Sequence, residues 1–232
     1  MKILIYNEGE HDKTPEIKKV YKDGIHGALK EALAEHDVTI VTLDNVGDIT
    51  EQLLNDTDVT LWWGHMRHAE VPDEVAARVQ NAVLRGMGFI ALHSAHMSKP
   101  FRLLMGTSCT LRWRENSRER IWVTSPSHPI ANGLPEQFEL PAEEMYGEFF
   151  DVPEPMETVF IGWYNSGEVF RSGLTYRRGL GKIFYFQPGH ESYPTFYNEN
   201  IIKVLNNAVL WAAPERRIDS IPCPCTPPLE KI

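Results

Sequence analysis

The chain has few cysteines, no excess of basic residues and no long hydrophobic run. Its three cysteines, Cys109, Cys223 and Cys225, are too few for a disulfide scaffold, and we interpret them as free thiols of a reducing compartment. Acidic residues outnumber basic ones by 32 to 23, which argues against nucleic acid or an anionic membrane as a partner. No stretch reaches the about 20 apolar residues of a membrane span, and no signal peptide precedes the first strand. We therefore expect a cytoplasmic protein.

The order of strand-like and helix-like segments indicates the fold class. Buried-strand patterns alternate with helical ones in the first half, while residues 109–170 contain short strand-like runs separated by proline-rich turns. Alternation of this kind predicts an α/β protein with a doubly wound, mostly parallel sheet and helices on both faces, elaborated by antiparallel strands in the second half. We expect one domain over residues 1–217 and a proline- and cysteine-containing tail over 218–232. The strands are expected at 3–6, 38–42, 59–63, 89–92 and 182–186, and the helices at 22–34, 73–84 and 199–212.

The segment from Gly86 to His96 has the pattern of a strand that ends in a tight turn of small residues. In many α/β enzymes such an elbow holds the catalytic nucleophile above the edge of the sheet. Here that position is occupied by His93, which is a poor nucleophile toward carbonyl groups. Histidine binds metals and transfers protons well, so the pattern favours metal or acid–base chemistry over acyl transfer.

Histidines also follow three other predicted strands, because His11, His65 and His190 each come within a few residues of a strand end. Ligands of open parallel sheets bind beyond the carboxyl ends of the strands. The alternative for each is a packed or solvated histidine. Glu148 precedes two phenylalanines, and a carboxylate among aromatic rings needs a cation or a donor to stay charged. The predicted ligands of a divalent metal, zinc foremost with manganese or iron as alternatives, are His65, His93, Glu148 and His190.

Arginines interleaved with aromatic residues favour a polar, ring-shaped ligand such as a sugar. Arg114 and Arg171 have this setting, and with Arg67 and Tyr146 they are the predicted ligand-binding residues. The chain has neither a complete GxGxxG fingerprint nor a Walker motif, so no nucleotide cofactor is expected.

Six separated motifs together resemble the ThuA-like family of trehalose utilisation proteins. The resemblance runs from about residue 1 to about residue 217, and it implies the fold of class I glutamine amidotransferases. It also implies that His93 stands at the position of the amidotransferase cysteine and His190 at that of its histidine, so amidotransferase activity should be absent. The motifs are Trp63–His65, Ala91–His96, Leu104–Cys109, Glu143–Glu148, Glu168–Gly173 and Ile183–Glu191.

The resemblance implies a role in the use of trehalose or related disaccharides, acting on the sugar or on its 3-keto derivative. Our hypothesis is a metal-assisted isomerisation or elimination, with His93, His190, Glu8 and His11 as the candidate proton-transferring residues. The alternative is a non-catalytic sugar-binding or regulatory protein on the same fold. The expected partner is a small-molecule sugar ligand, and a homo-oligomer is a further possibility.

Overall fold

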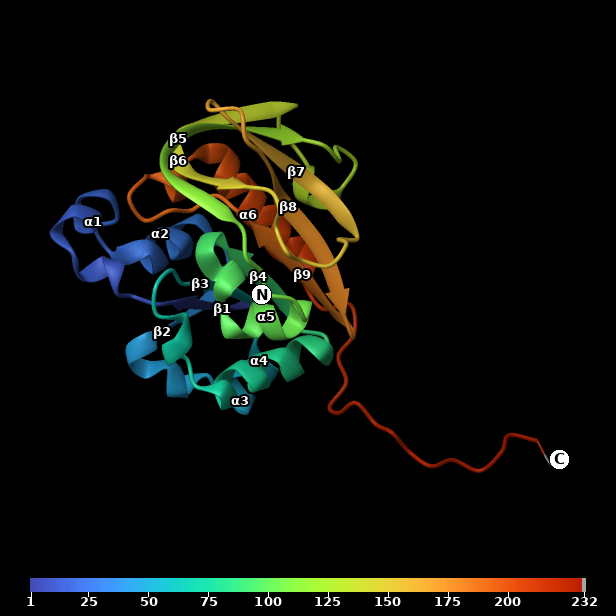
Figure 1. Ribbon diagram of the computed structural model, residues 1–232. Coiled ribbons are helices and arrows are strands. Elements are labelled where there is room, and N and C mark those ends of the chain that lie inside the picture. The colour runs from blue at the N-terminus through green and yellow to red at the C-terminus, as the bar shows by residue number, and fades with distance from the viewer. Residues whose placement is uncertain (231–232) are drawn as a thin grey trace.

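The chain folds around one nine-stranded sheet, and a computed structural model describes residues 1–230 (Figure 1). The strands are β1 (Lys2–Asn7), β2 (Asp37–Thr42), β3 (Val59–Trp63), β4 (Gly88–Leu92), β5 (Arg112–Val123), β6 (Gln137–Gly147), β7 (Glu157–Tyr164), β8 (Val169–Arg178) and β9 (Gly181–Phe186). The α-helices are α1 (Pro15–Val20), α2 (Gly24–Ala32), α3 (Glu51–Asp56), α4 (Asp73–Leu84), α5 (Lys99–Met105) and α6 (Glu199–Ala212). Short 3₁₀ helices are η1 (His11–Lys13), η2 (Leu43–Asp48), η3 (His68–Glu70), η4 (His93–Met97), η5 (Pro129–Ala131) and η6 (Thr195–Tyr197).

The sheet has a parallel half and an antiparallel half, with strand order β2-β1-β3-β4-β9-β8-β7-β5-β6. The strands from β2 to β9 in this order pair in parallel, and the four that follow pair antiparallel. The expected doubly wound sheet therefore describes the parallel half only. A hairpin between β8 and β9 continues the sheet beyond the parallel half and reverses the strand direction without a crossover helix.

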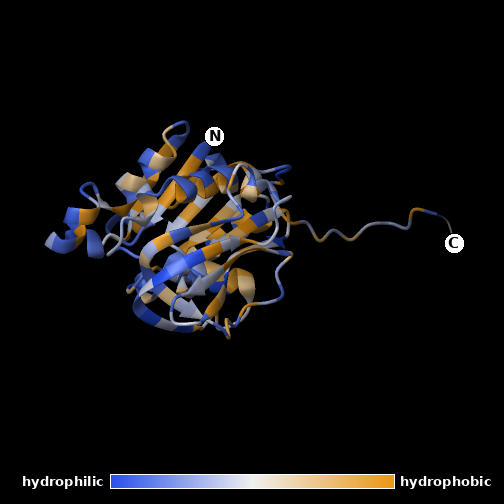
Figure 2. Cartoon of the chain, turned by 90° about the horizontal axis from the view of Figure 1, so that it is seen from above, coloured by the Kyte–Doolittle hydropathy of each residue, from blue (hydrophilic) through white to orange (hydrophobic). Residues whose placement is uncertain are grey.

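Helices cover both faces of the parallel half, and this explains why its inner strands are apolar throughout. In β1, Leu4 and Tyr6 belong to the apolar core shared with α3, α4 and α5, whereas Ile3 and Ile5 belong to the core shared with α2 and α6. Figure 2 shows the hydrophobic segments running through the middle of the molecule. All five residues of β3 and of β4 are buried.

The chain after α6 leaves the body as an extended segment (Figure 1). Arg217 still contacts the body, since its guanidinium donates to the backbone oxygens of Asn55 and Thr57. Residues 219–230 are exposed; the last two residues of the expected 218–232 tail lie outside the described part of the chain. Within residues 1–230, no helix combines the length and apolarity that a membrane crossing would need.

Candidate active site

His93 stands at the end of β4, where the backbone turns sharply into η4. Its φ of 53° lies in the left-handed region, which a residue with a Cβ rarely adopts. Such strained conformations gather at functional turns, and here the turn aims a fully buried imidazole past the sheet edge. Gly189, on the loop after β9, lies against this residue; a Cβ at that glycine would meet the Phe196 ring at 2.6 Å. The Phe196 ring and the φ of 137° at Gly189 together require glycine at this position.

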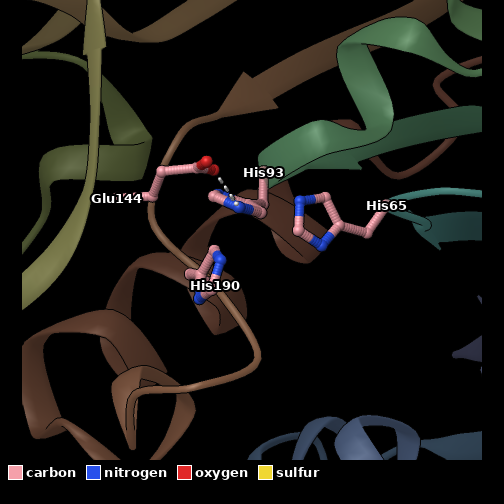
Figure 3. Close-up of side chains that lie close together, drawn as sticks. All are labelled: His65, His93, Glu144 and His190. Carbon is pink, nitrogen blue, oxygen red and sulfur yellow. Dashed lines mark ion pairs between the residues drawn. The ribbon is translucent and has the colours of Figure 1, made fainter. Parts of the chain in front are cut away.

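Four side chains from distant parts of the chain converge beside this turn (Figure 3). His65 follows β3, His93 follows β4, His190 follows β9, and Glu144 extends from β6. Each offers a nitrogen or oxygen atom, and these atoms all lie within 4.8 Å of one another. The parallel strands therefore deliver three imidazoles to one sheet edge, and the antiparallel half supplies the carboxylate.

His93 and Glu144 form the closest pair of the cluster. His93 Nε2 lies 3.0 Å from Glu144 Oε2, yet this oxygen has no hydrogen-bond partner of acceptable geometry among residues 1–230. Burial lowers the pKa of His93, but Glu144 and the nearby Glu143 outweigh burial and raise that pKa to about 9. For Glu144, burial raises the pKa, but the imidazoles outweigh it and lower the pKa. Without another cation, the site therefore holds a buried imidazolium–carboxylate pair.

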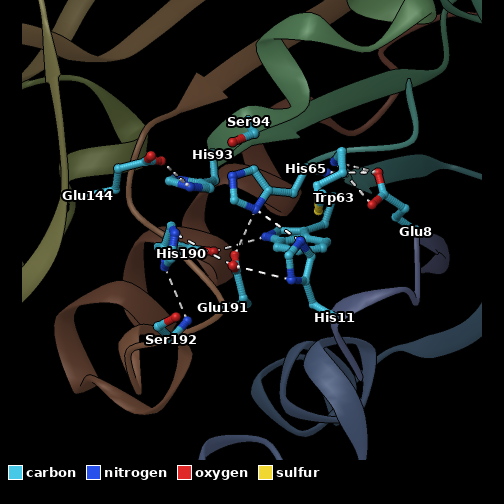
Figure 4. Close-up of polar contacts among 12 residues, drawn as sticks. Glu8, His11, Trp63, His65, His93, Ser94, Glu144, His190, Glu191 and Ser192 are labelled. Carbon is cyan, nitrogen blue, oxygen red and sulfur yellow. Dashed lines mark hydrogen bonds and ion pairs between the residues drawn. The ribbon is translucent and has the colours of Figure 1, made fainter. Parts of the chain in front are cut away.

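Hydrogen bonds on the outer side fix how His93 and His65 face the cluster (Figure 4). His93 Nδ1 lies 2.9 Å from the carbonyl oxygen of Gln187, which can only accept a hydrogen bond, so Nδ1 carries a proton. His65 Nδ1 is hydrogen-bonded to His11 Nε2 at 3.2 Å and lies 3.0 Å from a carboxylate oxygen of Glu191. If a metal cation took the place of the inner proton of His93, both imidazoles would direct an unprotonated Nε2 inward, as in metal-ligating histidines.

His190 carries its ring proton on the other nitrogen. Its Nδ1 accepts a hydrogen bond from the backbone N–H of Ser192 at 3.2 Å, so in the neutral ring Nε2 carries the hydrogen. Burial, together with the charge on His93, lowers the pKa of His190 to about 4 and keeps the ring neutral. Nε2 is buried without a hydrogen-bond partner among the described residues. The nearest carboxylate oxygens, those of Glu115 and Glu191, lie 3.6 Å from Nε2, so this N–H makes no hydrogen bond with them and can donate to a ligand.

Two members of the cluster, His65 and Glu144, line a cavity of about 540 Å³, a size typical of small-molecule sites, whereas His93 and His190 are not among its lining residues. One part of its wall is apolar and includes Trp113, whose side chain is 63% exposed. The polar part includes Ser94, His96, Glu115, Glu144 and Tyr146. Reactive groups and a ligand-sized space thus lie together.

Glu148, the carboxylate expected among the metal ligands, does not reach the cluster. It receives hydrogen bonds from Nε and Nη2 of Arg171 at 2.8 and 3.0 Å and from the backbone of Phe150. Glu144 takes its place in the cluster because it lies within β6, two residues before Tyr146, and side chains two apart share one face of a strand. The same alternation would put Glu148 on this face too, but β6 ends at Gly147, one residue before it, so the end of the strand separates the two glutamates.

Glu8 and His11 lie beside the cluster rather than in it. The carboxylate of Glu8 accepts hydrogen bonds from the backbone N–H groups of His65, Met66 and Arg67, so its oxygens hold the loop after β3 instead of facing the cavity. His11 lies behind His65, with Nδ1 3.4 Å from the same Glu191. Glu191 was not anticipated; its pKa is about 2, because contacts with the imidazoles outweigh the raising effect of burial.

The arginines expected to bind a ligand are engaged in ion pairs elsewhere. Arg67 pairs with Glu10 and Glu70, Arg114 pairs with Glu168, and Arg171 pairs with Glu148. None of the three is among the residues that line the cavity. Tyr146 does line it: its ring stacks on His93 at 5.1 Å, and its hydroxyl lies 2.7 Å from Ser94 Oγ.

Comparisons with known proteins agree on one family. A family model described as trehalose utilisation, ThuA, matches residues 2–212. Among solved structures, a ThuA-like protein from Parabacteroides merdae superposes with a TM-score of 0.71 at 16% identity, covering 95% of this chain and 92% of that one. No curated protein matches the sequence.

More distant structures share the fold. A cytoplasmic protein from Salmonella typhimurium has a TM-score of 0.60 at 11% identity, with 93% of this chain and all of that one covered. A glutamine amidotransferase from Thermotoga maritima has a TM-score of 0.52 at 10% identity, over 90% of this chain and 96% of the other. These likenesses support the amidotransferase-like fold.

Proposed function

Since the chain belongs to the ThuA family of trehalose utilisation, we propose that it is an enzyme of disaccharide metabolism that performs metal-assisted acid–base chemistry on a sugar or 3-keto-sugar. The observation that carries the proposal is the convergence of two inward-facing imidazoles and a buried carboxylate beside a ligand-sized cavity. Isomerisation or elimination of the sugar is the reaction class that this equipment suits.

His65, His93 and Glu144 fit the ligand set of a divalent metal. Two histidines and one carboxylate are the ligands of many catalytic zinc and non-haem iron sites. At metal–ligand distances of about 2.1 Å, neighbouring ligand atoms of a tetrahedral ion lie roughly 3.4 Å apart, which is comparable with the 3.0 Å between His93 Nε2 and Glu144 Oε2. A divalent ion bound there supplies a Lewis acid that polarises a carbonyl or a hydroxyl group.

His190 is the proposed proton-transferring residue. Its neutral ring points an Nε2–H into the cluster. There it can give this proton to the negatively charged oxygen that forms on the sugar and take a proton back from a sugar hydroxyl in a later step. Glu143 holds this loop in place, since its carboxylate accepts from the backbone N–H groups of Gly189 and His190 at 3.1 Å each. The geometry thus supports a separation of roles between three ligands and one proton carrier.

The test is metal content combined with turnover. We expect about one zinc, manganese or iron ion per chain, lost in Glu144→Gln and kept in the matched control Glu148→Gln, because only Glu144 lies beside the imidazoles. Metal-loaded protein should consume 3-keto-trehalose, and His190→Ala should lower kcat by about 10²-fold or more while metal content stays near one. Elemental analysis and product detection by mass spectrometry provide the measurements.

Two results would contradict the proposal. Wild-type protein that takes up none of the three metals would remove the metal-assisted mechanism. Tight binding of the sugar with no turnover under any metal would favour a non-catalytic sugar-binding protein. Glutaminase activity is not expected, because His93 replaces the thiolate that such chemistry needs.

A further inference from the structure

His96 is a second histidine on η4 that the proposed mechanism does not use. It is 6% exposed and is surrounded by aromatic rings, with Tyr146, Phe150 and Tyr185 at centroid distances of 5.4, 5.8 and 6.4 Å. Despite this packing it is one of the residues that line the cavity. A polar ring in such a place must satisfy both of its nitrogens.

One nitrogen of His96 is satisfied by the protein. Nδ1 lies 2.6 Å from the carbonyl oxygen of Cys109, which accepts hydrogen bonds only, so the ring proton is on Nδ1. Nε2 is then an acceptor. No residue among 1–230 forms a hydrogen bond with Nε2. Nε2 is nevertheless not one of the fully buried polar atoms without a partner, so part of its surface is accessible. Its open side is therefore the cavity.

The ring stays an acceptor over the whole working range of pH. Burial, the largest effect, lowers the pKa of His96 to about 3, more than the Cys109 carbonyl raises it. The backbone of Cys109 has a φ of 55°, which turns this residue into the left-handed region rarely adopted outside glycine. Because Cys109 holds its carbonyl in a strained conformation and the His96 ring stays neutral, the orientation of the His96 ring is fixed.

The other residues of the cavity wall indicate which kind of ligand could donate a hydrogen bond to His96 Nε2. The charged side chains that line the cavity, besides its histidines, are the acidic Glu115 and Glu144, and neither Lys nor Arg lines it. An anionic group is thus disfavoured on this wall, whereas hydrogen-bond donors are matched. The apolar part, formed by Met66, Met97, Leu111 and Trp113, suits the C–H face of a ring. A ring that combines an apolar face with several hydroxyl groups meets both requirements.

We propose that His96 is a specificity-determining residue, whose Nε2 accepts a hydrogen bond from one hydroxyl group of the bound sugar. The inference rests on the proposed function and adds to it the means by which the site recognises its ligand. A site that hydrogen-bonds a hydroxyl rejects the analogue that lacks it, because the acceptor is then left unpaired in a buried place.

A pair of substitutions separates the two nitrogens of His96. His96→Asn keeps an amide donor near the position of Nδ1, where it can still bond the Cys109 carbonyl, and removes the acceptor at Nε2. His96→Gln places its amide oxygen near the position of Nε2 and loses the Cys109 bond. The probes are trehalose and its monodeoxy derivatives, titrated calorimetrically into metal-loaded protein. Thermal unfolding of each variant provides the control for folding.

We expect wild-type protein to bind one monodeoxy derivative about tenfold more weakly than trehalose. His96→Asn should bind trehalose about tenfold more weakly and lose this discrimination, whereas His96→Gln should keep it. In wild-type protein, trehalose should also move the ¹⁵N resonance of His96 Nε2 upfield, a readout that needs no variant.

Equal discrimination by wild type and His96→Asn, or an unchanged Nε2 resonance in the saturated protein, would overturn the assignment and leave the proposed function standing. Wild-type protein that binds none of these sugars would overturn the assignment, and the proposed function fails with it only if 3-keto-trehalose is also neither bound nor consumed. If His96→Asn does not fold, the resonance and His96→Gln decide the question.

Discussion

Glu191 supports the site without belonging to the proposed ligand set. Its oxygens lie 3.0 Å from His65 Nδ1 and 3.4 Å from His11 Nδ1, so the carboxylate keeps both rings protonated on their outer sides. We expect Glu191→Gln to weaken metal binding by about 10- to 100-fold, as loss of such outer partners does elsewhere. Competition with a chelating dye measures the change. Glu168→Gln, which alters an exposed carboxylate paired with Arg114, should leave affinity unchanged; equal affinities in both variants would contradict this role of Glu191.

Side-chain direction explains which site residues could be predicted from the sequence. The histidines after β3, β4 and β9 were anticipated because parallel strands bring their carboxyl ends to one edge, whatever the details of packing. Glu144 and Glu148 could not be told apart, since the choice depends on where β6 ends. The partners of Arg114 and Arg171 are Glu168 and Glu148, 54 and 23 residues away. Such pairings arise only in the folded chain.

Among the elements, β5 carries a buried carboxylate that the mechanism leaves unexplained. Glu119 is fully buried, and neither of its oxygens has a hydrogen-bond partner among residues 1–230. Burial, reinforced by the charge on Glu143, raises its pKa well above the usual value. Gly162 on β7 makes the space, because a Cβ there would lie 2.3 Å from a carboxylate oxygen of Glu119.

The raised pKa of Glu119 predicts a pH-dependent effect on stability. The folded chain keeps a proton that the unfolded chain releases above about pH 4.5, so this residue's contribution to the free energy of unfolding falls as pH rises. Glu119→Gln carries no such proton, and its stability relative to wild type should increase between pH 4.5 and pH 8. Urea unfolding at both values measures the difference.

Glu139, on β6, provides the control of opposite sign. Hydrogen bonding to Arg120 is the main effect that lowers its pKa, so Glu139→Gln should lose stability relative to wild type as pH rises through the carboxyl range. A Glu119→Gln variant whose difference from wild type does not change with pH would show that the residue is ionised in the fold.

Sequence patterns predict the bounds of individual helices better than the order of the antiparallel strands. Helices α4 and α6 begin and end where their apolar periodicity predicts, at 73–84 and 199–212. Strand-like runs were anticipated between residues 109 and 170, but their order β8-β7-β5-β6 was not. Periodicity identifies the buried face of a strand, whereas its neighbour is chosen by hairpin register and by bulges such as those of β5.

At the scale of the whole molecule, the extended C-terminal segment is separable from the body. The last hydrogen bonds to the body come from Arg217, Ile218 and Asp219, which bond Asn55 at the end of α3 and Arg85 just after α4. Deleting residues 221–232 should therefore change the Tm by less than about 2 °C and leave metal content unaltered. Differential scanning calorimetry of the two chains measures this. A larger loss of Tm would mean that the segment packs on the protein.

The pairing of β4 with β9 has a consequence for how the protein is made. Phe89 lies opposite Ile183, so the edge of β4 stays unpaired until the chain up to β9 has left the ribosome. An open apolar edge of this kind can pair with other chains. Contacts between residues so far apart also slow folding. The cavity can therefore form only after β9 has been made, because β9 joins β4 to the antiparallel strands that supply Trp113 and Glu144.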